Sequence, residues 1–129
     1  MINNIIIIDS LIFIILGLIH FYWAFGRTIA LNKVIPTTTE GIKLFNPAKS
    51  LTIVVGIILL SFTYIVVLEM KSGITLLAIL FFTRAVGDFH HIGFFKKVKS
   101  TSFALYDTKY LSPLCLYLAI SLAFTAYNV

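Results

Sequence analysis

Hydrophobic residues occur in four long runs along the chain, at residues 5–25, 50–68, 74–95 and 111–127. The first three runs are long enough to cross a bilayer as helices, since a span needs roughly 20 apolar residues, and the fourth is only slightly shorter. The connection at residues 69–73 is so short that the second and third helices must be antiparallel neighbours. The pattern therefore predicts one all-α domain over residues 1–129, an integral membrane four-helix bundle with antiparallel up-down topology.

The composition agrees with a membrane protein. Of the 129 residues, 60% are hydrophobic and 12% are charged, whereas a soluble domain carries about 25% charged residues. This is too little charge to cover a water-facing surface, which excludes an ordinary soluble globular protein. No basic residue precedes the first run, and the run continues past Trp23 without a small-residue cleavage site. We therefore expect the run to be retained as a helix and not removed as a signal peptide.

The uneven placement of charge predicts an orientation. Eight of the ten lysines and arginines lie in two loops, at residues 26–49 and 96–110, on the same side of the predicted helices. Positively charged loops stay in the cytoplasm, so we expect a multi-pass protein of the cell membrane with both termini outside. The same residues would attract anionic lipid headgroups. We prefer this interpretation to nucleic-acid binding, because the lysines at positions 96, 97 and 99 directly adjoin a helix end.

Three ionisable residues interrupt the third apolar run. Arg84, Asp88 and His91 follow one another at spacings of four and three residues, so on a continuous helix they share one narrow face. A charge at membrane depth costs about 2.5–3.5 kcal/mol on translocon scales, and it persists where it pairs, faces protein or water, or has a function. His20 in the first run falls at a similar depth. The four residues are therefore predicted to form one buried polar site.

This predicted site has three interpretations. In the first, an Arg84–Asp88 ion pair only fixes helix packing, as in a structural or accessory subunit of a membrane complex. In the second, the site binds or transports a small polar or amphipathic molecule. In the third, His20 and His91 from facing helices ligate haem or a metal. An enzyme is the less expected class, because the sequence has no nucleophile elbow, zincin motif or phosphate loop.

Four longer strings carry a resemblance to a known family. They are His20-Phe21-Tyr22-Trp23-Ala24-Phe25-Gly26, Arg84-Ala85-Val86-Gly87-Asp88-Phe89, Gly93-Phe94-Phe95-Lys96-Lys97 and Asp107-Thr108-Lys109-Tyr110-Leu111-Ser112-Pro113-Leu114-Cys115. Together they resemble a bacterial family of small four-helix membrane proteins that is classed only as a domain of unknown function. The resemblance spans nearly the whole chain and brings no activity, substrate or cofactor. It implies a family-level pattern at His20, Trp23, Arg84, Gly87, Asp88, Asp107, Ser112 and Pro113.

The leading hypothesis is binding or transport of a small amphipathic or polar molecule in a polar cavity that opens toward the cytoplasm. No metal or cofactor is expected, and the family pattern often has an Arg-Tyr-like pair in place of His90-His91, which weakens the haem interpretation. The expected partners are the lipid bilayer and a second copy or another membrane protein, because one small chain would not enclose a full pathway. The candidate ligand-binding residues are His20, Trp23, Arg84, Asp88, His91 and Asp107.

Overall fold

The computed structural model describes residues 1–26, 28–29, 31–44 and 46–129. Its elements are α1 (Ile2–Ala24), α2 (Leu31–Val34), α3 (Lys49–Val67), α4 (Lys71–Val86), α5 (Ser102–Tyr106), the π-helix η1 (Asp107–Leu111) and α6 (Ser112–Asn128). Apart from one isolated antiparallel bridge between Thr37 and Lys43, the described residues contain no β-structure. The all-α prediction is confirmed, and α1 and α3 agree with the first two predicted runs to within three residues.

Three helices are long and apolar enough to cross a membrane, namely α1, α3 and the continuous helix Ser102–Asn128 that joins α5, η1 and α6. They suggest a membrane protein, in agreement with the sequence. Helix α4 has 16 residues and is therefore about 24 Å long at 1.5 Å per residue. This is shorter than the hydrocarbon core of a bilayer, which is about 30 Å thick.

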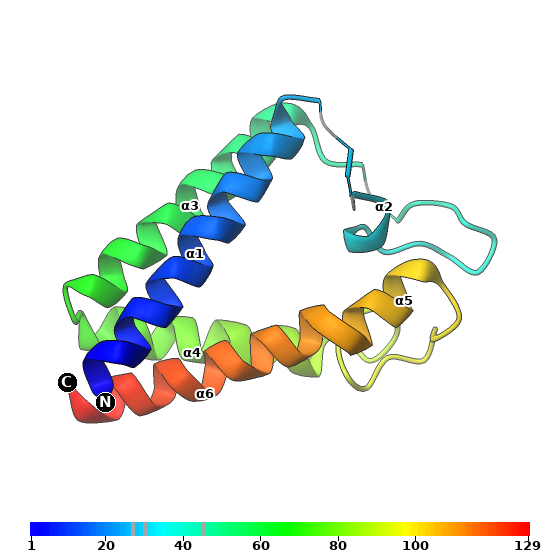
Figure 1. Ribbon diagram of the computed structural model, residues 1–129. Coiled ribbons are helices and arrows are strands. Elements are labelled where there is room, and N and C mark those ends of the chain that lie inside the picture. The colour runs from blue at the N-terminus through cyan, green and yellow to red at the C-terminus, as the bar shows by residue number, and fades with distance from the viewer. Residues whose placement is uncertain (27, 30, 45) are drawn as a thin grey trace.

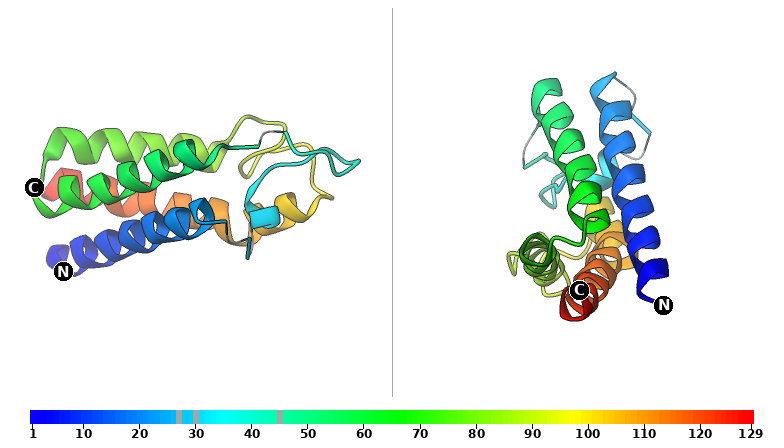
Figure 2. Two further views of the ribbon diagram at one scale, coloured as in Figure 1. Left: turned by 90° about the horizontal axis from the view of Figure 1, so that it is seen from above. Right: turned by 90° about the vertical axis from the view of Figure 1, so that its left-hand side faces the viewer.

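The four long helices form two closely packed antiparallel pairs, α1 with α3 and α4 with α6 (Figures 1 and 2). Gly17 and Gly56 bring the backbones of the first pair together. A Cβ atom on either glycine would lie 3.1 Å from the backbone oxygen of the other. Small residues allow this close approach, which strengthens van der Waals packing between apolar helices.

The two pairs meet at the end of the molecule that holds both termini, and they diverge toward the end where α2 and α5 lie (Figure 1). The buried core joins them. The ring of Phe13 on α1 lies 5.5 Å from that of Phe62 on α3 and 5.6 Å from that of Phe81 on α4. Leu118 and Leu122 of α6 are fully buried in the same cluster. The divergence leaves an open end, where the candidate site residues lie.

Helix α4 ends at Val86, well before the predicted end at residue 95. Gly87 and Gly93 both have positive φ, at 84° and 89°, a conformation that glycine adopts without steric cost. The turn brings their backbones very close together. A Cβ atom on Gly87 would overlap the Ile92 carbonyl group, and a Cβ atom on Gly93 would overlap the Val86 carbonyl group. The chain therefore folds back on itself, and the Phe94 N–H donates to the Ala85 carbonyl at 2.8 Å.

The last long helix begins at Ser102 and not at residue 111. The hydroxyl of Thr101 caps it by accepting a hydrogen bond from the Ala104 N–H at 3.0 Å. Pro113, which in the sequence indicated a helix start, instead lies just after the widened π-turn of η1. Proline has no N–H for the carbonyl four residues earlier, so the chain passes through an irregular turn there while the helix continues.

Candidate functional site

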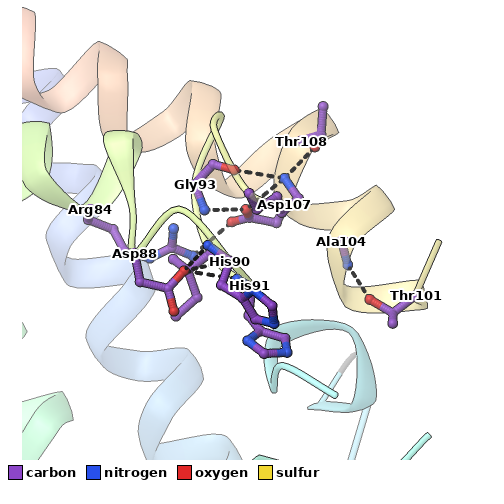
Figure 3. A network of polar contacts seen from close by, with 11 residues as sticks. Arg84, Asp88, His90, His91, Gly93, Thr101, Ala104, Asp107 and Thr108 are labelled. Carbon is purple, nitrogen blue, oxygen red and sulfur yellow. Dashed lines mark hydrogen bonds and ion pairs between the residues drawn. The ribbon is translucent and has the colours of Figure 1, made fainter. Parts of the chain in front are cut away.

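Asp107 is the centre of a buried ion-pair cluster (Figure 3). It is the first residue of η1, and its side chain is fully buried. Its Oδ1 accepts a hydrogen bond from Arg84 Nη2 at 2.8 Å. Its Oδ2 accepts from the Gly93 N–H at 2.9 Å and from Lys96 Nζ at 3.1 Å. These contacts connect the end of α4 and the following loop to the start of the last long helix.

Lys96 is a buried cation in this cluster, with a side chain only 1% exposed. Its ammonium group donates to Asp107, to the Gly93 carbonyl at 2.9 Å and to the Thr108 hydroxyl. All three protons of the ammonium group therefore have acceptors. A buried charge is tolerated when it is paired and fully hydrogen-bonded. The cluster thus satisfies its own lysine and carboxylate without help from a ligand.

Asp88 caps the loop that follows α4. Its Oδ1 accepts hydrogen bonds from the backbone N–H groups of His90 at 3.0 Å, His91 at 2.9 Å and Ile92 at 3.0 Å. The slight burial of the carboxyl group opposes its ionisation, but the three amide donors outweigh this effect and hold the pKa of Asp88 below its ordinary value. The side chain therefore stabilises the turn as an anion.

The predicted pairing of Arg84 with Asp88 on one helical face is wrong. An i,i+4 pair needs a continuous helix, and Gly87 ends α4 between the two residues. The Asp88 carboxylate accepts hydrogen bonds from backbone N–H groups of the loop. Arg84 pairs instead with Asp107, which lies 23 residues further along the chain. The ion pair that Arg84 forms is therefore with Asp107 and not with Asp88.

His91 lies in the same loop, so the facing-helix geometry of the haem and metal interpretation is absent. Its ring packs against that of His90, with 4.1 Å between centroids. His20 belongs to α1 and faces a different environment. Within the part of the chain that the structure describes, no group of three or more histidine, cysteine or acidic side chains is placed to hold a metal ion.

His20 and Trp23 line a cavity of about 330 Å³ between α1 and the last long helix. The Nδ1–H of His20 donates to the Leu16 carbonyl at 2.7 Å, which leaves Nε2 as the free nitrogen of the ring. The indole N–H of Trp23 donates to the Ile29 carbonyl at 3.0 Å. We call this space the aromatic cavity; its walls include Leu16, His20, Trp23, Tyr106, Tyr110 and Leu114.

The predicted residues therefore fall into separate places. Arg84 joins Asp107 in the ion-pair cluster, Asp88 and His91 belong to the adjoining turn, and His20 and Trp23 lie in the aromatic cavity. Sequence reasoning missed the buried Lys96, which was assigned to a surface loop because it is charged. It also missed the three tyrosines that line the cavity, Tyr22, Tyr106 and Tyr110. Positions 93–97 and 107–115 both carry the family resemblance, and this shared signal was the available hint that Lys96 and Asp107 belong together.

These features describe a small all-helical protein whose three long apolar helices suggest a membrane protein, with a buried ion-pair cluster and an aromatic cavity. The family model described as "Protein of unknown function (DUF3995)" matches residues 13–122, and the chain therefore belongs to this family. The match includes the cluster and all lining residues of the cavity, and it confirms the resemblance seen in the sequence. Comparisons with curated proteins and with solved structures found no match.

Proposed function

We propose that the chain is a multi-pass cell-membrane protein whose long helices lie in the bilayer as an antiparallel up-down bundle, with both termini outside. Support comes from the two basic segments that the sequence assigned to loops, residues 26–49 and 96–110, because their described residues occur at the open end of the molecule, opposite the termini (Figure 1). The exposed charge of these loops is lower than the sequence indicates, because Lys96 is buried. Arg27, another of the basic residues, lies outside the described residues.

Its function in this proposal is to bind a small amphipathic molecule in the aromatic cavity. The observation that carries the proposal is the cavity itself, whose volume of about 330 Å³ falls within the range of small-molecule sites, roughly 300–1,000 Å³. Such sites combine apolar walls with a few polar groups that orient the ligand. Here the walls are mostly aliphatic and aromatic side chains, and His20 and the tyrosines are the lining residues that carry polar groups.

The ion-pair cluster supports this cavity without contributing to its wall. Asp107 directly follows Tyr106 on the continuous helix, and Thr108, which receives a hydrogen bond from Lys96, lies between Tyr106 and Tyr110. The cluster anchors the helical segment that carries both tyrosines. Arg84 and Asp107 are therefore assigned to positioning, whereas His20 and Trp23 are assigned to ligand contact.

Anionic lipid headgroups are the proposed partners of the neighbouring surface. Lys33 of α2 lies over the Tyr106 ring at 5.9 Å, and Lys109 lies over the Tyr110 ring at 5.2 Å. Both lysines line a shallow pocket of about 220 Å³ that shares the two tyrosines with the aromatic cavity. Lysines close to a membrane surface attract acidic lipids by about 1 kcal/mol each. A second copy of the chain or another membrane protein is the proposed partner of the outer apolar faces.

The binding proposal can be tested by energy transfer from Trp23, the one tryptophan of the chain. The probe is dansyl-labelled undecanoic acid, added to the protein in zwitterionic lipid nanodiscs. We expect a saturable transfer signal that unlabelled undecanoic acid displaces. Leu16→Phe combined with Leu114→Phe fills part of the cavity volume that the ligand would occupy and should weaken binding at least tenfold, a loss of about 1.4 kcal/mol. Leu18→Phe combined with Ile120→Phe is the matched control on exposed faces and should leave binding unchanged.

A specific result separates this proposal from a purely structural or accessory role. If transfer rises without saturation in the wild type, or falls equally in both double variants, the cavity binds no amphipathic molecule. The accessory role would then be favoured by the ion-pair cluster, whose carboxylate and ammonium groups are satisfied entirely within the chain. His20→Phe offers a second check. It removes the ring nitrogen that is proposed to hydrogen-bond the probe, and the loss of that hydrogen bond should reduce probe affinity about three- to tenfold.

A further inference from the structure

Asp9 is a buried carboxyl group in the N-terminal half of the apolar helix α1, which lies at the end of the molecule where the two helix pairs meet. Its exposed fraction is 0%. Its Oδ1 lies 3.0 Å from the Ser121 hydroxyl on α6. Its Oδ2 is buried and has no hydrogen-bond partner. The Ser121 contact is a side-chain hydrogen bond that joins the α1–α3 pair to the α4–α6 pair.

No described cation compensates a negative charge on Asp9. Both ion pairs of the described residues involve Asp107 and none involves Asp9. The titratable group that faces Asp9 is Tyr117 of α6, whose neutral hydroxyl lies near the Asp9 carboxyl group and can share a hydrogen bond with it but supplies no positive charge. The cations on the neighbouring helices are remote or engaged, namely Lys49 at the far end of α3, Lys71 bound to the Val129 carbonyl and Arg84 bound to Asp107. An unpaired buried carboxylate costs several kcal/mol.

The hydrogen bonds around Ser121 indicate where a proton would lie. Its Oγ is 3.0 Å from Asp9 Oδ1 and 3.2 Å from the Leu118 carbonyl oxygen. With an ionised Asp9, both neighbours are acceptors, and the hydroxyl has only one proton to donate. With a protonated Asp9, the carboxyl O–H donates to Ser121 Oγ and Ser121 donates to Leu118. One added proton therefore turns both contacts into proper hydrogen bonds.

We propose that Asp9 is a proton-binding site, a carboxylic acid that stays neutral at pH 7 as long as α1 and α6 are in contact. Ionisable residues inside apolar helices are the groups from which proton relays and ion pathways are built. This site is distinct from the aromatic cavity, which lies at the open end of the molecule, and it holds whether or not the cavity binds an amphipathic molecule. Release of the proton would place an unpaired charge in the junction of the two helix pairs and so weaken that junction.

Infrared spectroscopy tests the proposal directly. Purified wild-type protein and Asp9→Asn are compared in zwitterionic vesicles at pH 7. We expect the C=O stretch of a protonated carboxylic acid in the wild type and its loss in Asp9→Asn. Asp88→Asn is the matched control: it removes an exposed, ionised aspartate and should leave the acid band intact. Asparagine mimics a neutral acid, so the unfolding temperature of Asp9→Asn should equal that of the wild type or exceed it.

Two further measurements distinguish a proton site from a cation site at Asp9. Ser121→Ala retains Asp9 and removes its partner, so the acid band should shift in frequency and persist; this variant also serves if Asp9→Asn does not fold. When sodium chloride replaces choline chloride in the buffer, the acid band should stay unchanged. If a carboxylate band replaces the acid band in sodium chloride, Asp9 is a cation site. A carboxylate band from Asp9 at pH 7 in choline chloride would overturn the proposal.

Discussion

Removal of the Asp107 carboxyl group should be among the most damaging single changes in this protein. Asp107→Leu deletes the acceptor of three hydrogen bonds, from Arg84, Gly93 and Lys96. Arg84 is partly exposed, with 31% of its side chain accessible, and can turn toward solvent or headgroups. Lys96 has no such option, because its side chain is only 1% exposed. The substitution therefore leaves an uncompensated ammonium group inside the protein.

The magnitude follows from the burial of Lys96. Removing one partner of a buried ion pair costs about 3–5 kcal/mol, because the other charge stays desolvated and unpaired. The orphaned Gly93 N–H contributes within that range, since losses in one network do not add. A whole domain is stable by about 5–15 kcal/mol. We therefore expect Asp107→Leu to lose a large part of the free energy of unfolding.

The assay is reversible unfolding in mixed micelles by titration with a denaturing detergent at pH 7, followed by far-UV circular dichroism. Asp88→Ala is the control, because it also removes an aspartate that accepts three hydrogen bonds, but an exposed one. It should cost about 0.5–1.5 kcal/mol. The double variant Asp107→Leu with Lys96→Met removes both charges and should recover most of the loss, because apolar residues of similar volume replace buried ion pairs well.

Two outcomes would refute this reasoning. One is a loss below about 1 kcal/mol for Asp107→Leu, since an unpaired buried charge costs far more. The other is a double variant no more stable than Asp107→Leu alone. A double-mutant cycle adds a further check on the choice of partner. Arg84 should couple to Asp107 by about 0.5–3 kcal/mol and show far weaker coupling to Asp88, the partner that the sequence suggests.

The remaining predictions use the same titration. Gly93→Ala should cost several times more than Gly41→Ala: both glycines have positive φ, but a Cβ atom overlaps backbone only at Gly93, and Gly41 has no atom within 4 Å; equal losses would contradict the close contact. Gly17→Ala should cost about 1–3 kcal/mol, because its Cβ atom would press on the backbone oxygen of Gly56 at 3.1 Å, and a neutral result would show that α1 and α3 separate freely. Asp88 has a lowered pKa in the folded chain, so its contribution is complete above the unfolded value of about 3.9 and is lost as pH falls through the folded value. The stability difference between wild type and Asp88→Asn should therefore shrink in acid and stay constant from pH 5 to 7, and a difference that grows in acid would contradict the capping role.

The sequence predicted the helix bounds closely for the first two apolar runs. Helices α1 and α3 agree with their predicted ranges because nothing in those runs competes with the helix. It failed after Val86, where an apolar run continues through a turn. Glycine is common within membrane helices, so Gly87 did not indicate in the sequence that the helix ends there. The Asp88 side chain offers the backbone an alternative set of hydrogen bonds, which hydropathy does not reveal.

The structure places the predicted site residues in a different arrangement from the one that the sequence suggested. Arg84 was recognised as a charge that needs a partner, and Asp107 was included through the family resemblance. The choice between Asp88 and Asp107 depends on a contact across 23 residues, which local spacing cannot supply. Lys96 was assigned to the surface because most lysines lie there. Its burial depends on acceptors that exist only after the turn at Gly93 and the helix at Asp107 have come together.

Two fully buried aspartates on this apolar scaffold illustrate how partners decide the role of one residue type. Asp107 meets a guanidinium group, an ammonium group and an amide, so its negative charge is compensated and can hold a turn and two helices together. Asp9 meets a hydroxyl group that also faces a carbonyl oxygen, and no described cation lies beside it. Protonation of Asp107 therefore removes the negative charge that pairs with Arg84 and Lys96. Protonation of Asp9 instead supplies the proton that its contact with Ser121 lacks. Acidification should accordingly loosen the contact between α4 and the last long helix before it affects the junction of the two helix pairs.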